Sequence, residues 1–216
     1  MTTTFDLSTE TCKEFDENRE ALLKDLSTQE QTENQDDELG DLTIWKSFIF
    51  RQDLNLIPFR LLVAKGVPDV LRGPVWKLLS HSTFHPDESR TFEQLIAESL
   101  DVDFDTKNAI EKDIARTFPK HVLFETRQGQ NQLWKVLSAY AACDPQVGYC
   151  QGMGFIAAFL LCYTCAEDAF WILRSVMLRP EYDLRSMLLP GSELIFFVAL
   201  FFFHRIYDKC KTSAEI

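Results

Sequence analysis

The sequence predicts an all-α protein, and three observations lead to this prediction. Apolar residues recur every three or four positions in several segments, as in the run Leu133–Tyr140, which is the spacing of one helix face. No segment shows a convincing alternation of apolar and polar residues, the pattern of a half-buried strand. Turn-forming residues separate the apolar segments, for example Gly66-Val67-Pro68 and Asp144-Pro145.

The expected helices follow one another beyond residue 50. Asp69 can cap the helix expected at Val70–Leu79. The segment Met153–Cys165 is apolar almost all round, which predicts a central buried helix. A polar turn is expected at Arg127-Gln128-Gly129-Gln130, before the run that Asp144-Pro145 ends. The expected segments are Leu54–Ala64, Val70–Leu79, Thr91–Leu100, a helix opened by Asp105 or Thr106, Leu133–Tyr140, Met153–Cys165 and Asp168–Leu178.

An acidic leader precedes the helical part of the chain. Residues 1–50 contain 13 acidic and four basic residues, so they carry −9 of the formal net charge of −11. A segment of this composition buries too little apolar surface to offset the entropy of ordering. We therefore expect a mostly disordered leader at 1–44 and one helical domain at 45–216, in which packing begins at Trp45.

The remaining composition excludes several classes of protein. The nearly neutral body has no block of Lys and Arg, so nucleic acid is not the expected partner. The longest apolar runs, Phe155–Cys162 and Leu194–Phe203, are too short for a transmembrane helix, which takes about 20 residues. Six cysteines without a secretory signal predict reduced thiols and a cytoplasmic location.

A candidate site begins with Ile110, Asp113 and Arg116. Steps of three place these side chains on one helix face. Pro119 disfavours helical geometry at the residue before it, so Arg116 is expected in the last helical turn, projecting outward. An ordinary ion pair between Asp113 and Arg116 on a solvated helix face is the structural alternative.

The second part of the candidate site is the segment that contains Tyr149 and Gln151. These two residues point the same way if the segment is extended, and the glycines at 148, 152 and 154 allow a partner backbone to approach closely. The next helix begins directly afterwards, and its free N–H groups would suit an anionic ligand. An exposed arginine and a glutamine at such a place are typical of proteins that help another protein hydrolyse a nucleotide.

With these elements the chain resembles the TBC-domain family, the GTPase-activating proteins for Rab GTPases. The resemblance is strongest over residues 45–185, whereas residues 184–216 match poorly, which implies a TBC-like domain with a shortened or divergent C-terminal part. Three elements carry it, in this order: Arg72-Gly73-Pro74-Val75-Trp76, the Ile-x-x-Asp-x-x-Arg pattern of Ile110, Asp113 and Arg116, and the Tyr-x-Gln pattern of Tyr149 and Gln151.

The resemblance implies a GTPase-activating protein for a GTP-bound Rab and a role in vesicle trafficking. Arg116 would act as an arginine finger on the phosphates, and Gln151 would orient the attacking water. Asp113 and Tyr149 would steady the two fingers, and Arg72 with Trp76 would form a structural anchor under the site. GTP and Mg²⁺ would come with the partner, since the chain has no nucleotide-binding motif, hydrolase site or cofactor of its own.

Two other functions stay open at this point. One is a non-catalytic TBC-like adaptor that binds a GTPase without stimulating hydrolysis, and the other is a helical scaffold that needs no finger chemistry. Peripheral recruitment to endomembranes through the partner is an open alternative to a purely cytoplasmic location. Cys162 and Cys165 form a C-x-x-C pattern, for which buried inert thiols in an apolar helix are expected rather than a redox or zinc site.

Overall fold

The computed structural model describes Trp45, Ile49, residues 66–80, Ser82, residues 88–180, Tyr182 and residues 184–188. These residues contain helices and no strand, which confirms the predicted all-α class. The leader at 1–44, the expected helix Leu54–Ala64 and the apolar run Leu194–Phe203 lie outside the described residues. No helix in the described ranges is long and apolar enough to cross a membrane.

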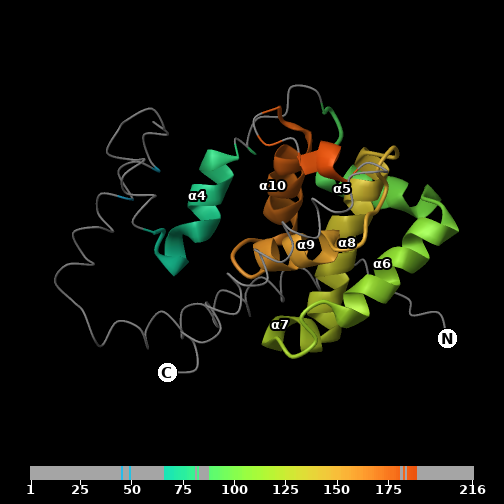
Figure 1. Cartoon of the computed structure of the whole chain (residues 1–216), viewed down its shortest axis with the longest axis horizontal. Coiled ribbons are helices and arrows are strands. Elements are labelled where there is room, and N and C mark those ends of the chain that lie inside the picture. Colours follow the sequence, from blue (N-terminus) through green and yellow to red (C-terminus); the bar gives the residue numbers. More distant parts are fainter. Residues whose placement is uncertain are drawn as a thin grey trace.

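The described elements form a bundle around one long helix, α8 (Figure 1). Helix α4 stands at one side of the bundle next to α10, and α9 lies below α10 in this view. In chain order the elements are η1 Asp69–Leu71, α4 Arg72–Leu79, α5 Phe92–Glu98, η2 Ser99–Asp101, α6 Phe104–Arg116, α7 Val122–Glu125, α8 Arg127–Cys143, α9 Met153–Leu161, α10 Ala166–Leu178 and η3 Leu184–Met187.

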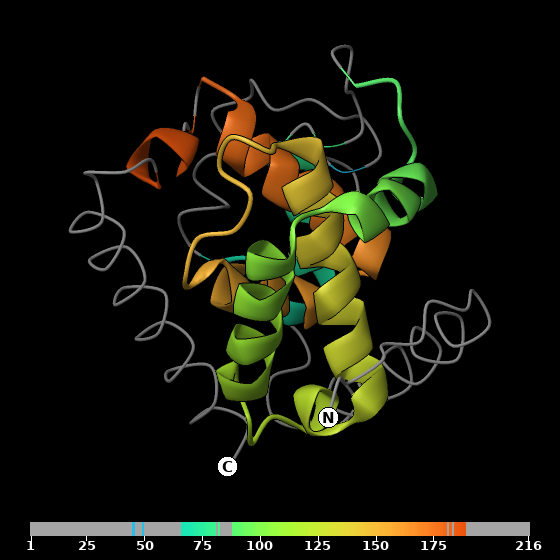
Figure 2. The ribbon, with the colours of Figure 1, turned by 90° about the vertical axis from the view of Figure 1, so that its right-hand side faces the viewer.

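Helix α8 is central because its apolar residues are surrounded by neighbouring helices. It packs against α5, α6, α7, α9 and α10, and Figure 2 shows α6 and α8 running alongside each other. The residues expected on its inner face, which lie between Leu133 and Tyr140, are fully buried in the main core. Apolar burial of this kind contributes about 25 cal/mol per Å² removed from water, so α8 organises the fold.

Helix α8 begins at Arg127, so the polar turn expected at 127–130 is its first helical turn. The hydroxyl oxygen of Thr126 accepts a hydrogen bond from the Gly129 backbone N–H at 3.1 Å and caps the helix. A Cβ atom at Gly129 would lie 1.8 Å from the backbone oxygen of Leu123, because α7 crosses the start of α8 closely. This glycine therefore serves close packing rather than a turn.

Several other helix boundaries also differ from expectation. Helix α4 begins at Arg72 and α10 at Ala166, and Asp69 lies in η1 and pairs with Arg72 at 2.6 Å instead of capping a helix. Helix α6 begins at Phe104 rather than at Asp105 or Thr106, because Asp103 accepts a hydrogen bond from the Thr106 backbone N–H at 2.9 Å. Phe104 is 75% exposed and does not lie on the buried face of α6, so the spacing of buried residues did not reveal that the helix includes it. Helix α9 ends at Leu161, four residues earlier than expected, because the chain turns there to start α10.

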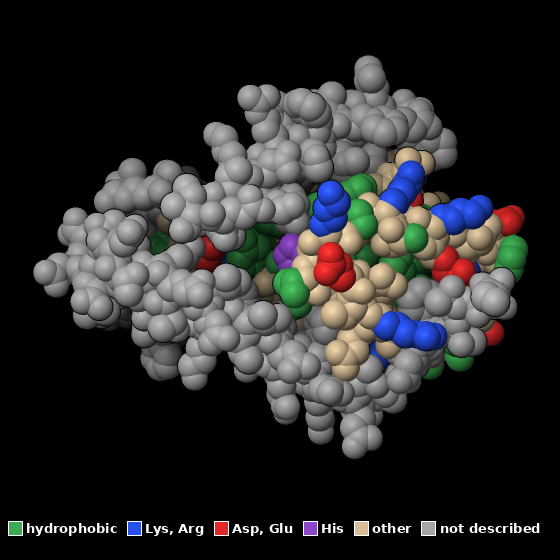
Figure 3. Space-filling view, turned by 90° about the horizontal axis from the view of Figure 1, so that it is seen from below, with side chains coloured by type: hydrophobic (Ala, Val, Ile, Leu, Met, Phe, Trp, Pro, Cys, Tyr) green, Lys and Arg blue, Asp and Glu red, His purple; other side chains and the backbone are tan. Residues whose placement is uncertain are grey.

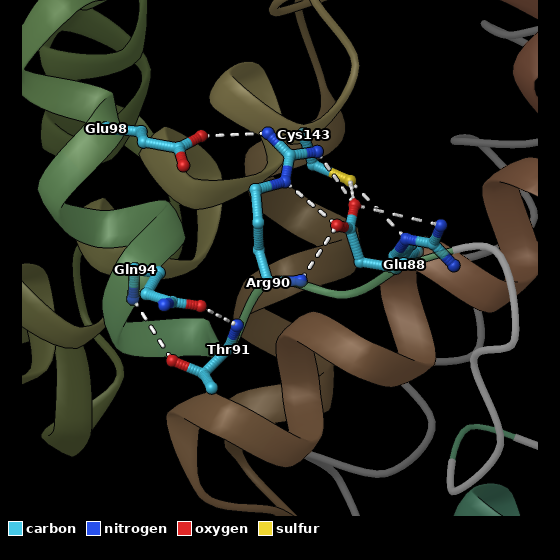
Figure 4. A network of polar contacts seen from close by, with 7 residues as sticks. Glu88, Arg90, Thr91, Gln94, Glu98 and Cys143 are labelled. Carbon is cyan, nitrogen blue, oxygen red and sulfur yellow. Dashed lines mark hydrogen bonds and ion pairs between the residues drawn. The ribbon is translucent and has the colours of Figure 1, made fainter.

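Helix α5 lies within the segment expected at Thr91–Leu100, and Thr91 is its N-cap. Thr91 and Gln94 form a reciprocal capping box, with the Gln94 backbone N–H donating to the Thr91 hydroxyl oxygen at 3.3 Å and the Gln94 side chain accepting from the Thr91 N–H at 2.7 Å (Figure 4).

A polar cluster next to this cap joins three parts of the bundle. The Glu88 carboxylate accepts hydrogen bonds from the Arg90 guanidinium at 2.8 Å and from the Cys143 thiol at 3.4 Å, while Arg174 donates to the Cys143 sulfur at 3.4 Å (Figure 4). The hydrogen bond from Arg90 is the main reason that the pKa of Glu88 falls from 4.5 to about 2. The cluster thus connects the segment before α5 to the ends of α8 and α10.

Candidate functional site

The first part of the site is the end of α6, where Arg116 is the last helical residue. The Thr117 hydroxyl donates to the backbone oxygen of Asp113 at 2.7 Å, and Phe118 then adopts a positive φ of 44°. This left-handed backbone costs a non-glycine residue about 1–2 kcal/mol. The Phe118 ring is buried 5.2 Å from the ring of Phe155, and this packing holds the turn. The Arg116 side chain is left half-exposed, at 50%.

Asp113 connects the end of α6 to the start of α9. Its side chain is buried, and one carboxylate oxygen forms an ion pair with Arg116. The other oxygen accepts hydrogen bonds from the Tyr149 hydroxyl and from the Gly152 backbone N–H, the latter at 3.1 Å. Ile110, one turn earlier on the same helix, packs into the main core. The face predicted from sequence spacing therefore runs from a buried apolar residue to an exposed cation.

The segment before α9 reaches Asp113 because it contains glycines where the backbone requires them. Gly148 and Gly152 have positive φ angles of 57° and 101°, which side-chain-bearing residues rarely adopt. A Cβ atom at Gly154 would lie 2.9 Å from the Thr117 hydroxyl oxygen, so the start of α9 touches the end of α6. The close approach anticipated for these glycines is toward the protein's own α6.

Gln151 lies next to Arg116 and is exposed. In the amide orientation that satisfies its hydrogen-bonding groups, the Gln151 side-chain oxygen accepts from Arg116 Nη2 at 3.0 Å and from Nη1 at 3.3 Å. The two side chains predicted as fingers thus meet at one exposed place, although one comes from the end of α6 and the other from the segment before α9.

Tyr149 stays protonated in this arrangement. Burial raises the pKa of Tyr149 well above its usual value, and the hydrogen bond to the charged Asp113 raises it further. The neutral phenol is therefore a permanent hydrogen-bond donor to the carboxylate. Tyr149 holds its own segment against α6, which places the neighbouring Gln151.

The start of α9 is not an open anion site. The Gly152 N–H donates to Asp113, and the Met153 N–H donates to the Cys150 backbone oxygen at 3.1 Å. The expectation of free N–H groups at this helix end is wrong for these positions, because Asp113 takes the place of an external anion. Positive charge at the site comes instead from the half-exposed Arg116.

Arg72 and Trp76 lie at the opposite end of α9 from Gln151. The Arg72 guanidinium donates to the Tyr163 hydroxyl at 2.7 Å and lies 5.2 Å from the centre of the Tyr163 ring. The Trp76 ring lies 5.2 Å from the Phe159 ring. These contacts attach α4 to the C-terminal end of α9, so both residues stand apart from the finger contacts.

His121 lies next to Cys162, the first cysteine of the C-x-x-C pattern. The His121 ring caps α7, with Nδ1 accepting from the Leu123 N–H at 3.3 Å and Nε2 3.8 Å from the Cys162 sulfur. Cys162 and Cys165 occupy the turn between α9 and α10 and are half-buried, rather than lying inside a buried helix as expected. The described residues contain no group of three or more potential metal ligands.

Sequence reasoning overlooked a second contact to the segment that contains Gln151. The buried carboxylate of Asp144 accepts from Arg185 Nε at 2.7 Å and Nη2 at 3.2 Å, and from the Tyr140 hydroxyl at 3.1 Å. Burial by itself would raise the pKa of Asp144, but the hydrogen bonds and charge of Arg185 outweigh it and lower the pKa. Asp144 was expected only to end a helix, and no sequence pattern connects it to Arg185.

On the face seen in Figure 3, Lys and Arg side chains of the described residues are scattered among other types. They do not form a continuous basic surface on the described part of this face, the kind of surface that nucleic-acid backbones require.

A sequence profile of the Rab-GTPase-TBC domain matches residues 69–212, which is more than half of the chain. The chain belongs to this family. The match includes every predicted site residue and continues past residue 185, where the resemblance had been weaker.

Among solved structures, this TBC domain is similar to the crystal structure of the Chlamydomonas flagellar RabGAP TBC domain, with a TM-score of 0.57 and 23% sequence identity. The match covers 82% of this chain and 56% of the solved one, so the chain spans little more than half of that domain's length. At this identity the likeness shows the fold.

Proposed function

We propose that this TBC-domain protein accelerates GTP hydrolysis on a GTP-bound Rab-type GTPase, with Arg116 and Gln151 supplied in trans. The observation that supports this proposal is the hydrogen-bonded contact between a half-exposed guanidinium and an exposed carboxamide at one place on the surface. GTP and Mg²⁺ come with the partner. The protein works in the cytoplasm in vesicle trafficking, where the partner recruits it to endomembranes.

The proposed mechanism begins from the resting contacts of Arg116. Its guanidinium has five N–H donors, and in the free protein the carboxylate of Asp113 and the amide oxygen of Gln151 accept from it. When a GTPase docks, phosphate oxygens of its GTP replace Gln151 as hydrogen-bond acceptors of Arg116, while the ion pair between Arg116 and Asp113 remains. The arginine then neutralises the charge that develops on the phosphates.

The released Gln151 side chain is then available to orient the attacking water. Its carboxamide can accept a hydrogen bond from the water and donate another to the phosphate. An arginine finger contributes a factor of about 10³ to 10⁵ in rate, or about 4–7 kcal/mol of barrier. If Gln151 is lost, Arg116 still neutralises the charge on the phosphates, but the attacking water is no longer oriented. Arg116 and Gln151 therefore contribute separately to the rate of hydrolysis.

The test is single-turnover GTP hydrolysis by a panel of purified Rab proteins, with the full chain and with Arg116→Ala and Gln151→Ala. Lys112→Ala is the control, because it removes an exposed positive charge from the same helix without touching either finger. A large drop in stimulation in both finger variants, with wild-type stimulation in the control, supports the proposal. Rab binding without stimulation identifies an adaptor, and absence of binding leaves a scaffold; both outcomes refute it.

A further inference from the structure

The segment from Asp144 to Gly152 is attached to the helical body at both of its ends. At its C-terminal end, the carboxylate of Asp113 accepts hydrogen bonds from Tyr149 and Gly152, on either side of Gln151. Asp113 and Tyr149 belong to the Ile-x-x-Asp-x-x-Arg and Tyr-x-Gln patterns, so the sequence had already singled them out. The N-terminal end is attached by different residues, which come from α8 and from η3.

Asp144 is the centre of the N-terminal attachment. Its backbone N–H donates to the Tyr140 oxygen at 2.9 Å as the C-cap of α8, and its backbone oxygen accepts from the Gly148 N–H at 2.8 Å. The first five residues of the segment are thereby closed into a turn. The side chain of Asp144 is only 8% exposed, so its carboxylate needs a partner within the protein.

Arg185 supplies this partner and also holds a second residue of the turn. Its Nε and Nη2 atoms bind the two oxygens of the Asp144 carboxylate, and Nη2 also donates to the Gln146 side-chain oxygen. Arg185 lies in η3, which packs on α10, and Leu188 directly after η3 is buried in the main core. One guanidinium thus connects the turn to a fixed part of the bundle.

We propose that Arg185 is a positioning residue for Gln151. It fixes the turn at 144–148, and the two residues that follow, Tyr149 and Cys150, lead from this turn to Gln151 next to Arg116. This inference rests on the proposed function, because its effect on catalysis passes through Gln151. This role requires the planar guanidinium of arginine, because one side chain binds both carboxylate oxygens of Asp144 and the amide oxygen of Gln146. A lysine would keep the positive charge but could not bind three oxygens in this geometry.

The physical need for a second attachment follows from the glycines. Gly148 and Gly152 lie on either side of Gln151 and have no Cβ atom, so the backbone there is less restricted than at other residues. An attachment through Asp113 alone leaves the residues before Tyr149 free to move. Displacement of a catalytic group by about 1 Å lowers a rate by about a hundredfold, so a small shift of the turn is measurable.

The first experiment is a double-mutant cycle in the GTPase assay. Arg185→Lys is expected to lower kcat for stimulated hydrolysis by about tenfold or more, with KM for the GTP-loaded GTPase unchanged. In the Gln151→Ala background the same replacement is expected to change kcat less than twofold. Arg179→Lys, a conservative change at the C-cap of α10, is the matched control and is expected to retain wild-type kcat. An equal loss in both backgrounds, or no loss in the wild-type background, overturns the proposal.

The second experiment does not depend on any GTPase. Amide hydrogen exchange of residues 144–151 is expected to become faster in Arg185→Lys and in Gln146→Ala, with residues 133–141 of α8 unchanged as the internal reference. Gln146→Ala keeps the Asp144 ion pair, so it reports on the turn even if loss of Arg185 unfolds the chain. Unchanged exchange in the segment overturns the attachment. Faster exchange in a protein that stimulates no Rab supports the attachment and refutes the proposed function.

Discussion

Replacing Asp113 by alanine should destabilise the protein, because this buried carboxylate is the acceptor for two segments at once. The change removes the hydrogen bonds from the Tyr149 hydroxyl and the Gly152 N–H. A hydrogen bond to a charged group contributes about 1.5–3 kcal/mol, so the two together amount to roughly 3–6 kcal/mol of unfolding free energy. The ion pair with Arg116 adds about 0–1 kcal/mol at most, since that guanidinium is half-exposed to solvent.

Urea unfolding followed by circular dichroism measures this loss as a shift of the midpoint at constant m-value. Glu111→Ala is the matched control, because it removes an acidic side chain from the same helix without removing a contact to α9, and it should change stability by about 0.5 kcal/mol or less. A loss below about 1 kcal/mol for Asp113→Ala, or equal losses in the two variants, would contradict the role of Asp113 as the link between α6 and α9.

Three further outcomes are expected. Arg116→Lys keeps the charge but loses the planar fork, so stimulated hydrolysis in the single-turnover assay should fall by about a hundredfold or more, and near-wild-type rates would refute the finger role. Gly152→Ala, at a φ of 101°, should lower the unfolding free energy by about 1–3 kcal/mol in urea titrations, and an unchanged midpoint would show that the backbone is not strained there. For Glu88, the folded pKa of about 2 lies below the ordinary 4.5, so its contribution to stability is complete above about pH 4.5 and is lost as the pH falls toward 2. Arg90→Ala should flatten this part of the pH dependence of the urea midpoint, and an unchanged slope would exclude Glu88 as its source.

Much of the helical structure was predictable because its signals are local. The apolar spacing in α8 and α10 acts within one or two helical turns. The errors occurred where a boundary depends on a tertiary neighbour, or on a local cap that was not recognised, as with Asp103 before α6. Gly129 was expected in a turn, yet it lies in the first turn of α8, where the lack of a side chain allows Leu123 to approach closely. Helix α7, with four residues, is too short for periodicity to reveal.

The residues of the candidate site also divide into those that local sequence patterns identified and those that only tertiary contacts revealed. Arg116 and Gln151 were identified from spacing and from the family resemblance, since both lie in short, distinctive patterns. Thr117 and Phe118 were not assigned a role, although they end α6 with a hydroxyl-to-carbonyl hydrogen bond and a left-handed residue. Arg185 was overlooked altogether, because its partners Asp144 and Gln146 are remote in sequence.

The sequence alone determined where the longer described helices lie and which two side chains are candidates for finger chemistry, because helical periodicity and short motifs are encoded by near neighbours in the chain. Only the tertiary structure decided that the two side chains meet, that Asp113 fills the N-terminus of α9 and that η3 holds the segment before Gln151. The physical reason is that a buried carboxylate must find its hydrogen-bond donors wherever packing places them, and packing brings together residues that no local pattern connects.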